Sequence, residues 1–196
     1  ALPIYNENWR AEKGGLPIER EKRMSDLDRR LLLGGLVAGG TALAAARPTW
    51  AGPAEMTMKD LKKDTDVACL YHCDFANDQR YDTMLRNINN HLSAYEFDPF
   101  KIKIVIVAHG GGIKYHLSDL AGTPWEQLPP HDPELDKRIK GLAGYGVEVY
   151  LCRITFQRSN IDLGKARKED YVKIVPSGVA TVGELQGKGF GYLKVG

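Results

Sequence analysis

An unbroken run of β-branched residues constrains the fold of this chain more than any other feature. In the segment 103–108, Lys103 is followed by Ile-Val-Ile-Val-Ala without another polar residue. A strand of this composition is buried on both faces, and such strands occur in parallel sheets covered by helices on each side. The segment therefore predicts an α/β domain with this strand near its centre.

Strand and helix patterns alternate through residues 55–196, which we interpret as one domain. Apolar runs mark the strands, and apolar residues at helical spacing mark the helices. Asn77 and Asp132 are expected to cap two helices, the second with proline at its first position. The pattern predicts a mostly parallel, five-stranded sheet. The four further strands are expected at residues 66–73, 147–151, 171–175 and 192–195, and the helices at 77–95, 132–144, 160–168 and 178–187.

The first 51 residues have a different character. The sixteen residues 31–46 carry no charge, which is shorter than the ~20 residues that span a bilayer comfortably but typical of the apolar core of an export signal. Arg29 and Arg30 stand directly before this run, so the segment resembles a twin-arginine signal. We therefore divide this part into an N-terminal extension, residues 1–23, and a signal or retained membrane anchor, residues 24–51.

Two interpretations of this segment remain open, and both place the domain in the periplasm. A signal peptidase would cut after the small residues that follow the apolar run. A retained segment would instead associate with the cytoplasmic membrane through residues 29–50, with the arginine pair on the cytoplasmic side.

The charge distribution argues against a nucleic-acid partner. The chain has 27 basic and 25 acidic residues, and the excess of basic residues lies within residues 1–51. The remainder is neutral and has no basic stripe, whereas binding to phosphates requires a dense patch of cations.

Parallel sheets place their chemistry at the carboxyl ends of the strands, where this chain has Cys73, His109 and Cys152. Cys152 is the candidate nucleophile. A helix or turn that begins there would direct backbone N–H groups at the sulfur, and Arg153 would add positive charge that favours the thiolate. The alternative is that Cys152 is a small buried hydrophobic residue.

His109 is followed by three glycines, which allow the backbone to approach a ligand or another chain segment closely. It is a candidate base or hydrogen-bond partner for a sulfur anion, and the alternative is a structural role in its own loop. The glycine run is neither a dinucleotide-binding fingerprint nor a phosphate-binding loop, so no cofactor is expected.

The chain has three cysteines, too few for a disulfide scaffold. Cys73 is a candidate second thiol that forms a disulfide with Cys152 or resolves an adduct on it. His72, Cys73, His109 and Cys152 lack the local spacing of a zinc site, so no metal is expected.

Five short motifs occur in the order typical of one family, and together the region 66–196 resembles the DsrE/DsrF-like sulfur-relay family, which includes the TusD and YchN proteins. The resemblance implies a flavodoxin-like three-layer α/β sandwich, usually assembled as trimers or hexamers. In relay members a cysteine at a strand end accepts sulfur as a persulfide, and Cys152 stands at that position. The motifs are Tyr71-His-Cys-Asp-Phe75, Leu85-Arg-Asn-Ile-Asn-Asn-His91, Ala108-His-Gly110, Leu151-Cys152 with Thr155 and Asn160-Ile161, and Val175-Pro-Ser-Gly-Val-Ala180.

Two functions follow as hypotheses. The first is a periplasmic sulfur carrier with its persulfide on Cys152, which exchanges sulfur with a donor or acceptor protein or a small sulfane-sulfur compound. The second is a non-catalytic accessory subunit or binding module, anchored in the membrane by its N-terminal segment. A homo-oligomer is expected from the family resemblance and from the aromatic residues Tyr115, Trp125 and Phe190. The alternative role of these rings is to fill the domain's own core.

Overall fold

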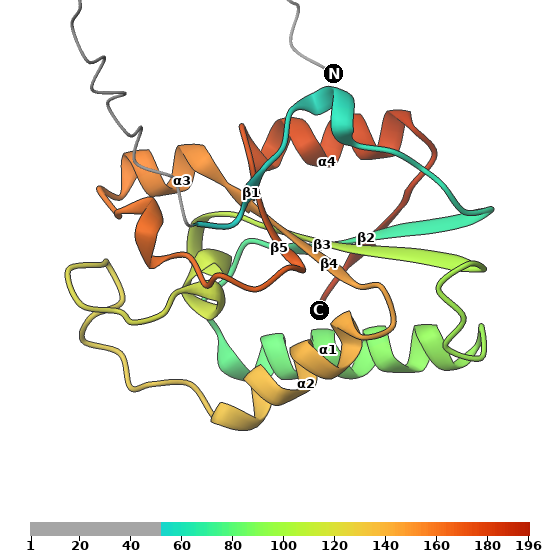
Figure 1. Cartoon of the computed structure of the whole chain (residues 1–196). Helices are drawn as coiled ribbons and strands as arrows, with labels where there is room; N and C mark the ends of the chain where they lie inside the picture. Colours follow the sequence, from blue (N-terminus) through green and yellow to red (C-terminus); the bar gives the residue numbers. More distant parts are fainter. Residues whose placement is uncertain (1–51) are drawn as a thin grey trace, which may run out of the picture. The chain divides into compact units, whose positions relative to one another are not determined.

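The computed structural model describes residues 52–196, and the predicted extension and signal or anchor segment lie outside this range. The described residues form an α/β domain around one six-stranded sheet in which every pair of neighbouring strands is parallel (Figure 1). The strand order is β1-β5-β4-β3-β2-β6. The strands are β1 (Ala54–Glu55), β2 (Val67–Cys73), β3 (Ile102–Ala108), β4 (Glu148–Cys152), β5 (Val172–Val175) and β6 (Gly191–Lys194).

The β-branched run forms β3, which lies between β2 and β4. Its residues from Ile104 to Ala108 are at most 1% exposed, as expected for a strand covered on both faces. Side chains alternate between the two faces: Ile104 and Ile106 join one apolar cluster, and Val105 and Val107 join the other. The sheet therefore has a core on each side, and the prediction for this segment is confirmed.

Helices cover both faces of the sheet and complete three layers (Figure 1). Helices α1 (Asp78–Ser93) and α2 (Pro133–Ala143) contribute buried residues to the larger cluster, and α4 (Gly178–Gly187) contributes to the smaller one. The predicted caps are present: the side chain of Asn77 accepts a hydrogen bond from the backbone N–H of Arg80, and that of Asp132 accepts one from Glu134. Within residues 52–196, no helix combines the length and apolarity needed to cross a membrane.

Two details of the prediction were wrong. The sheet has a sixth strand, β1, which pairs with β5; its two residues are both exposed, so it carries no apolar pattern. No helix spans residues 160–168, which contain only a single 3-10 turn at Leu163–Lys165. The helix of this region lies earlier: α3 (Arg153–Arg158) starts directly after β4. Asn160 has a positive φ of 51°, which breaks a helix at this point.

Candidate functional site

Three neighbouring strands bring the predicted residues to one edge of the sheet. β2 ends at Cys73, His109 directly follows β3, and β4 ends at Cys152. Side chains two residues apart in a strand share a face, and Leu70, Val107 and Tyr150 all belong to the cluster on the α4 side. His72, His109 and Cys152, each two residues further along, therefore lie at the same edge and on the same face.

Gly178 lies between the side chains of His109 and Cys152. A Cβ atom added to this glycine would lie 2.9 Å from the Cβ and 3.1 Å from the Cδ2 of His109, and 3.1 Å from the Cβ of Cys152. The two side chains thus lie on either side of the first residue of α4. Since Ser177 caps this helix through a hydrogen bond from Ala180, the site contains the positive end of a well-formed helix dipole.

The Cys152 side chain is well covered. The residue is 4% exposed and occupies the N-cap position of α3, so the first turn of a second, short helix also begins beside it. In the part of the chain that the structure describes, no hydrogen bond joins its sulfur to His109. Cys152 therefore lies at the start of α3 and beside Gly178, the first residue of α4, with His109 on the other side of that glycine.

Arg153, the predicted source of positive charge, contacts a different partner. Its guanidinium forms an ion pair with Glu55, with Nη2 and Oε1 2.5 Å apart. Glu55 lies in β1, the strand that the sequence pattern did not reveal. The structure thus places Arg153 next to Cys152 along the chain, but with its charge directed to a carboxylate.

Backbone contacts fix His109 and the three glycines after it. The N–H of His109 donates to the carbonyl of Cys73 (3.1 Å), and the N–H of Gly110 donates to Oγ1 of Thr155 in α3 (3.0 Å). A Cβ atom on Gly112 would stand 2.1 Å from the Cys73 carbonyl oxygen, so no other residue fits there without displacing the end of β2. The glycine run therefore permits close approach to another segment of the same chain.

His72 and Tyr192 extend the site, and the sequence patterns did not single out either as a partner of His109. The Nε2 atoms of His72 and His109 are 2.6 Å apart, and Nδ1 of His72 is 2.8 Å from the Tyr192 hydroxyl. Burial lowers the pKa of His109, the neighbouring His72 lowers it further, and Asp74 opposes both effects. His109 is thereby kept neutral to a lower pH than an exposed histidine.

Cys73 lies on the other face of the sheet. It is fully buried in the cluster under α1 and α2. In the sheet register Cys73 is paired with Ala108, and Ala108 is paired with Leu151 rather than with Cys152. Burial raises the pKa of the Cys73 thiol well above the usual range. All three cysteines are free, and the structure does not bring Cys73 and Cys152 together as a thiol pair.

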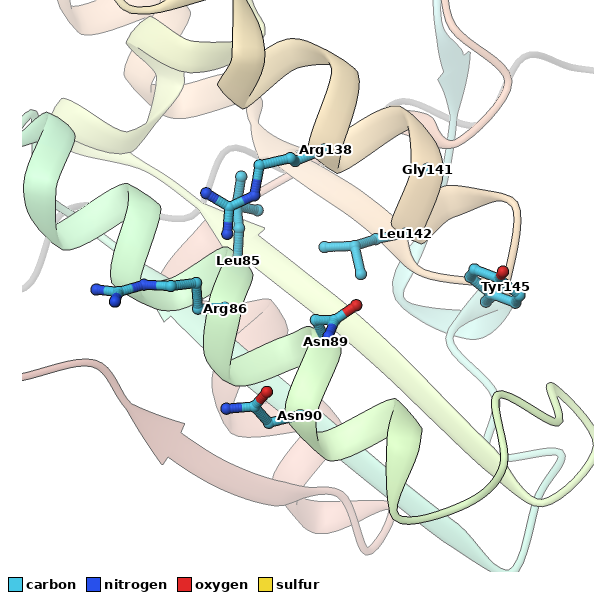
Figure 2. A pocket seen from close by; sticks show the side chains of 8 residues that line it. All are labelled: Leu85, Arg86, Asn89, Asn90, Arg138, Gly141, Leu142 and Tyr145. Atoms are coloured by element: carbon cyan, nitrogen blue, oxygen red, sulfur yellow. The ribbon is translucent and has the colours of Figure 1, made fainter.

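A groove of about 460 Å³ lies elsewhere, between α1 and α2. Figure 2 shows Leu142 in α2 and Tyr145 just after that helix on one side of the groove, with Asn89 from α1 opposite. Both arginines at the groove, Arg86 and Arg138, form ion pairs with the single carboxylate of Asp82. The groove lies on the sheet face opposite α4 and does not include Cys152.

The remaining predicted residues occupy structural positions. Tyr115 and Phe190 are buried in the core of the domain, and Trp125 packs partly buried against the larger cluster. These rings thus fill the domain's own interior to a large extent. Across residues 52–196 there is no group of three or more histidine, cysteine or acidic residues arranged to hold a metal ion.

Comparisons with known proteins identify the fold and the family of this chain. A solved structure of a protein of unknown function, MTH1491 from Methanobacterium thermoautotrophicum, is similar to 66% of this chain and 99% of that chain, with 22% identity and a TM-score of 0.53. No curated protein matches. The family model described as the DsrE/DsrF-like family matches residues 58–195, which include every strand except β1, and the chain therefore belongs to the DsrE/DsrF-like family, which is associated with sulfur relay.

Proposed function

We propose that this protein is a sulfur-relay carrier that holds a persulfide on Cys152. The observation that carries the proposal is the meeting of Cys152, His109 and the first turn of α4 around Gly178. A helix N-terminus favours the thiolate form of a cysteine, and the thiolate is the nucleophile in sulfur transfer. The family of the chain supports this use of the site.

The transfer conserves atoms and electrons without a cofactor. His109 takes the proton of the Cys152 thiol, and the thiolate attacks the outer sulfur of a donor persulfide, R–S–SH. A new S–S bond forms on Cys152 while the S–S bond of the donor breaks. The leaving thiolate RS⁻ receives the proton from His109, so the products are the Cys152 persulfide and the thiol RSH.

The low exposure of Cys152 restricts how sulfur reaches it. Val179, the residue after Gly178 in α4, is 71% exposed and provides an apolar side chain on the surface close to the site along the chain. We propose that donors are either small sulfane-sulfur compounds or proteins that dock beside the start of α4. The twin-arginine-like segment supports a periplasmic location, and the family resemblance supports a homo-oligomer, a trimer or hexamer.

Mass spectrometry of the intact protein tests the proposal. Incubation with a small persulfide donor is expected to add one sulfur, about 32 Da, to the wild type and to a Cys69→Ser control. The Cys152→Ser variant is expected to remain unmodified. An unmodified wild type, or an adduct that persists in Cys152→Ser, rejects a carrier role for Cys152.

A second candidate function is a non-catalytic, membrane-anchored accessory subunit. Two observations favour it: Cys152 is only 4% exposed, and the charge of Arg153 is directed to Glu55 rather than to the thiol. This function predicts no sulfur adduct, together with retention of residues 24–51 in cells. Detection of a mature N-terminus near Gly52 contradicts the anchor.

A further inference from the structure

A direct contact between two imidazole rings marks the site beyond Cys152. His72 and His109 have ring centroids 4.8 Å apart, and their Nε2 atoms are 2.6 Å apart. At this distance one nitrogen donates a hydrogen and the other accepts it. Two imidazolium cations would place two hydrogens between these nitrogens, so in this geometry the pair carries at most one positive charge.

A third residue connects this pair to solvent. The hydroxyl of Tyr192 lies 2.8 Å from Nδ1 of His72, and the two rings meet edge to face with centroids 5.7 Å apart. Tyr192 lies in β6, which pairs with β2, and is 41% exposed. A continuous hydrogen-bonded chain therefore runs across three strands, from His109 beside Cys152 to an exposed phenol.

We infer that His72 and Tyr192 are positioning residues that fix the orientation of the His109 ring and the nitrogen on which it carries its proton. This inference rests on the proposed function, because it assigns the proton-exchanging residue its partners. A phenol oxygen that accepts a hydrogen bond from Nδ1–H of His72 leaves Nε2 of that ring as an acceptor for the Nε2–H of His109. Nδ1 of His109 then carries no hydrogen and can take the proton of the Cys152 thiol.

The titratable groups that face His109 are separate from the contact that holds its loop. The titratable groups that face it are His72 from β2, Asp74 just after β2, and the Cys152 thiol, while Tyr192 acts through His72. Its loop is held independently, by the bond from Gly110 to Thr155. Removal of His72 or of the phenol hydroxyl should therefore change the imidazole without releasing the backbone.

The variants Tyr192→Phe and His72→Ala test the inference. Long-range ¹H–¹⁵N NMR spectra of the full chain measure the tautomer of His109 directly. We expect one tautomer of His109 in the wild type, a mixture in Tyr192→Phe, and a higher titration midpoint in His72→Ala. Sulfur loading of Cys152 near neutral pH should fall about tenfold in His72→Ala, less than the roughly 10²-fold or larger loss expected on removal of the acid–base group itself, because His109 is retained.

A matched pair elsewhere in the fold serves as the control. Nδ1 of His91 lies 3.2 Å from the Tyr71 hydroxyl, on the face away from Cys152. His91→Ala should leave the His109 spectrum and the loading rate unchanged. A His109 tautomer and midpoint unaffected by both test variants overturn the inference. Changed spectra without any sulfur adduct on the wild type would instead overturn the proposed function and leave the inference in place.

Discussion

Gly178 contacts His109 so closely that a single added methyl group would not fit. The added Cβ would stand 2.9 Å from the Cβ of His109, and 3.1 Å from the Cβ of Cys152. Cys152 is the last residue of β4 and His109 directly follows β3, so both are held by central strands of the sheet. The spacing between the histidine and the cysteine thus depends on the absence of a side chain at the start of α4.

The Gly178→Ala variant should displace one of these two side chains. Overpacking of this kind lowers the free energy of unfolding by about 1–3 kcal/mol. Urea unfolding measures this change, and sulfur loading of Cys152 should slow in the same variant.

Gly183 provides the matched control in the same helix. A Cβ at this exposed position meets nothing within 4 Å. Gly183→Ala should therefore raise the stability by up to about 1 kcal/mol, as alanine is the better helix former. Equal effects of the two substitutions would show that the spacing at Gly178 is not restrictive.

Local sequence patterns were sufficient to predict the strand and helices that position the site. The β-branched run predicted β3, and Asn77 and Asp132 predicted the starts of α1 and α2, because burial and capping are encoded within a few residues. β1 was not predicted, since its two exposed residues owe their strand conformation to pairing with β5.

The contacts within the site could not be predicted in the same way. Tyr192 reaches His72 because β6 pairs with β2, and no local pattern encodes that strand order. The ion pair of Arg153 with Glu55 also depends on strand order. Alternation along each strand contained a usable signal, since it places His72, His109 and Cys152 on one face once the sheet is known to be parallel.

Buried His116 should make the stability of the domain depend on pH. It is 1% exposed, and its Nε2 has no hydrogen-bond partner. Burial, reinforced by the charge of Arg167, lowers its pKa to about 3. In the unfolded chain the His116 imidazole binds a proton as the pH falls below about 6.5, whereas in the folded protein it stays neutral until the pH nears 3. Its contribution to stability is therefore retained above about pH 6.5 and is lost progressively as the pH falls toward 3. From pH 7 to pH 5 the expected loss from this residue is about 2 kcal/mol.

Urea unfolding of the wild type and of His116→Leu at both pH values isolates this contribution. The leucine cannot titrate, so the variant should lose about 2 kcal/mol less than the wild type between pH 7 and pH 5. Other histidines with lowered pKa values, such as His91, contribute equally to both proteins and cancel in the difference. Parallel pH profiles for the two proteins would contradict the assignment.

The ion pair between Lys114 and Asp78 should be important for stability. The Lys114 side chain is 3% exposed, and its Nζ lies 2.7 Å from Oδ1 of Asp78, which also accepts a hydrogen bond from the Tyr115 hydroxyl. Asp78→Asn leaves the lysine buried without its counter-charge, and such changes destabilise by about 3 kcal/mol or more. Chemical unfolding at neutral pH measures the effect.

A second substitution separates loss of the charge pair from general disruption. Lys114→Met removes the buried charge, so the double variant with Asp78→Asn should recover most of the lost stability. Glu134→Gln, which breaks an exposed pair with Lys137, should change stability by less than about 1 kcal/mol. Additive effects in the double variant would show that the two residues do not interact in the folded protein.

Cys73 should be unreactive in the folded protein, which bears on whether it serves as a second thiol. It is fully buried, burial raises its pKa, and its side chain lies on the face opposite Cys152. In a variant whose only thiol is Cys73, alkylation should be at least about 1000-fold slower than in urea, because it requires unfolding of a domain with ordinary stability. A variant that retains only the half-buried Cys69 should react faster in its native state. Rapid native alkylation of Cys73, followed by mass spectrometry, would instead reveal an opening of the sheet that makes this thiol available to Cys152.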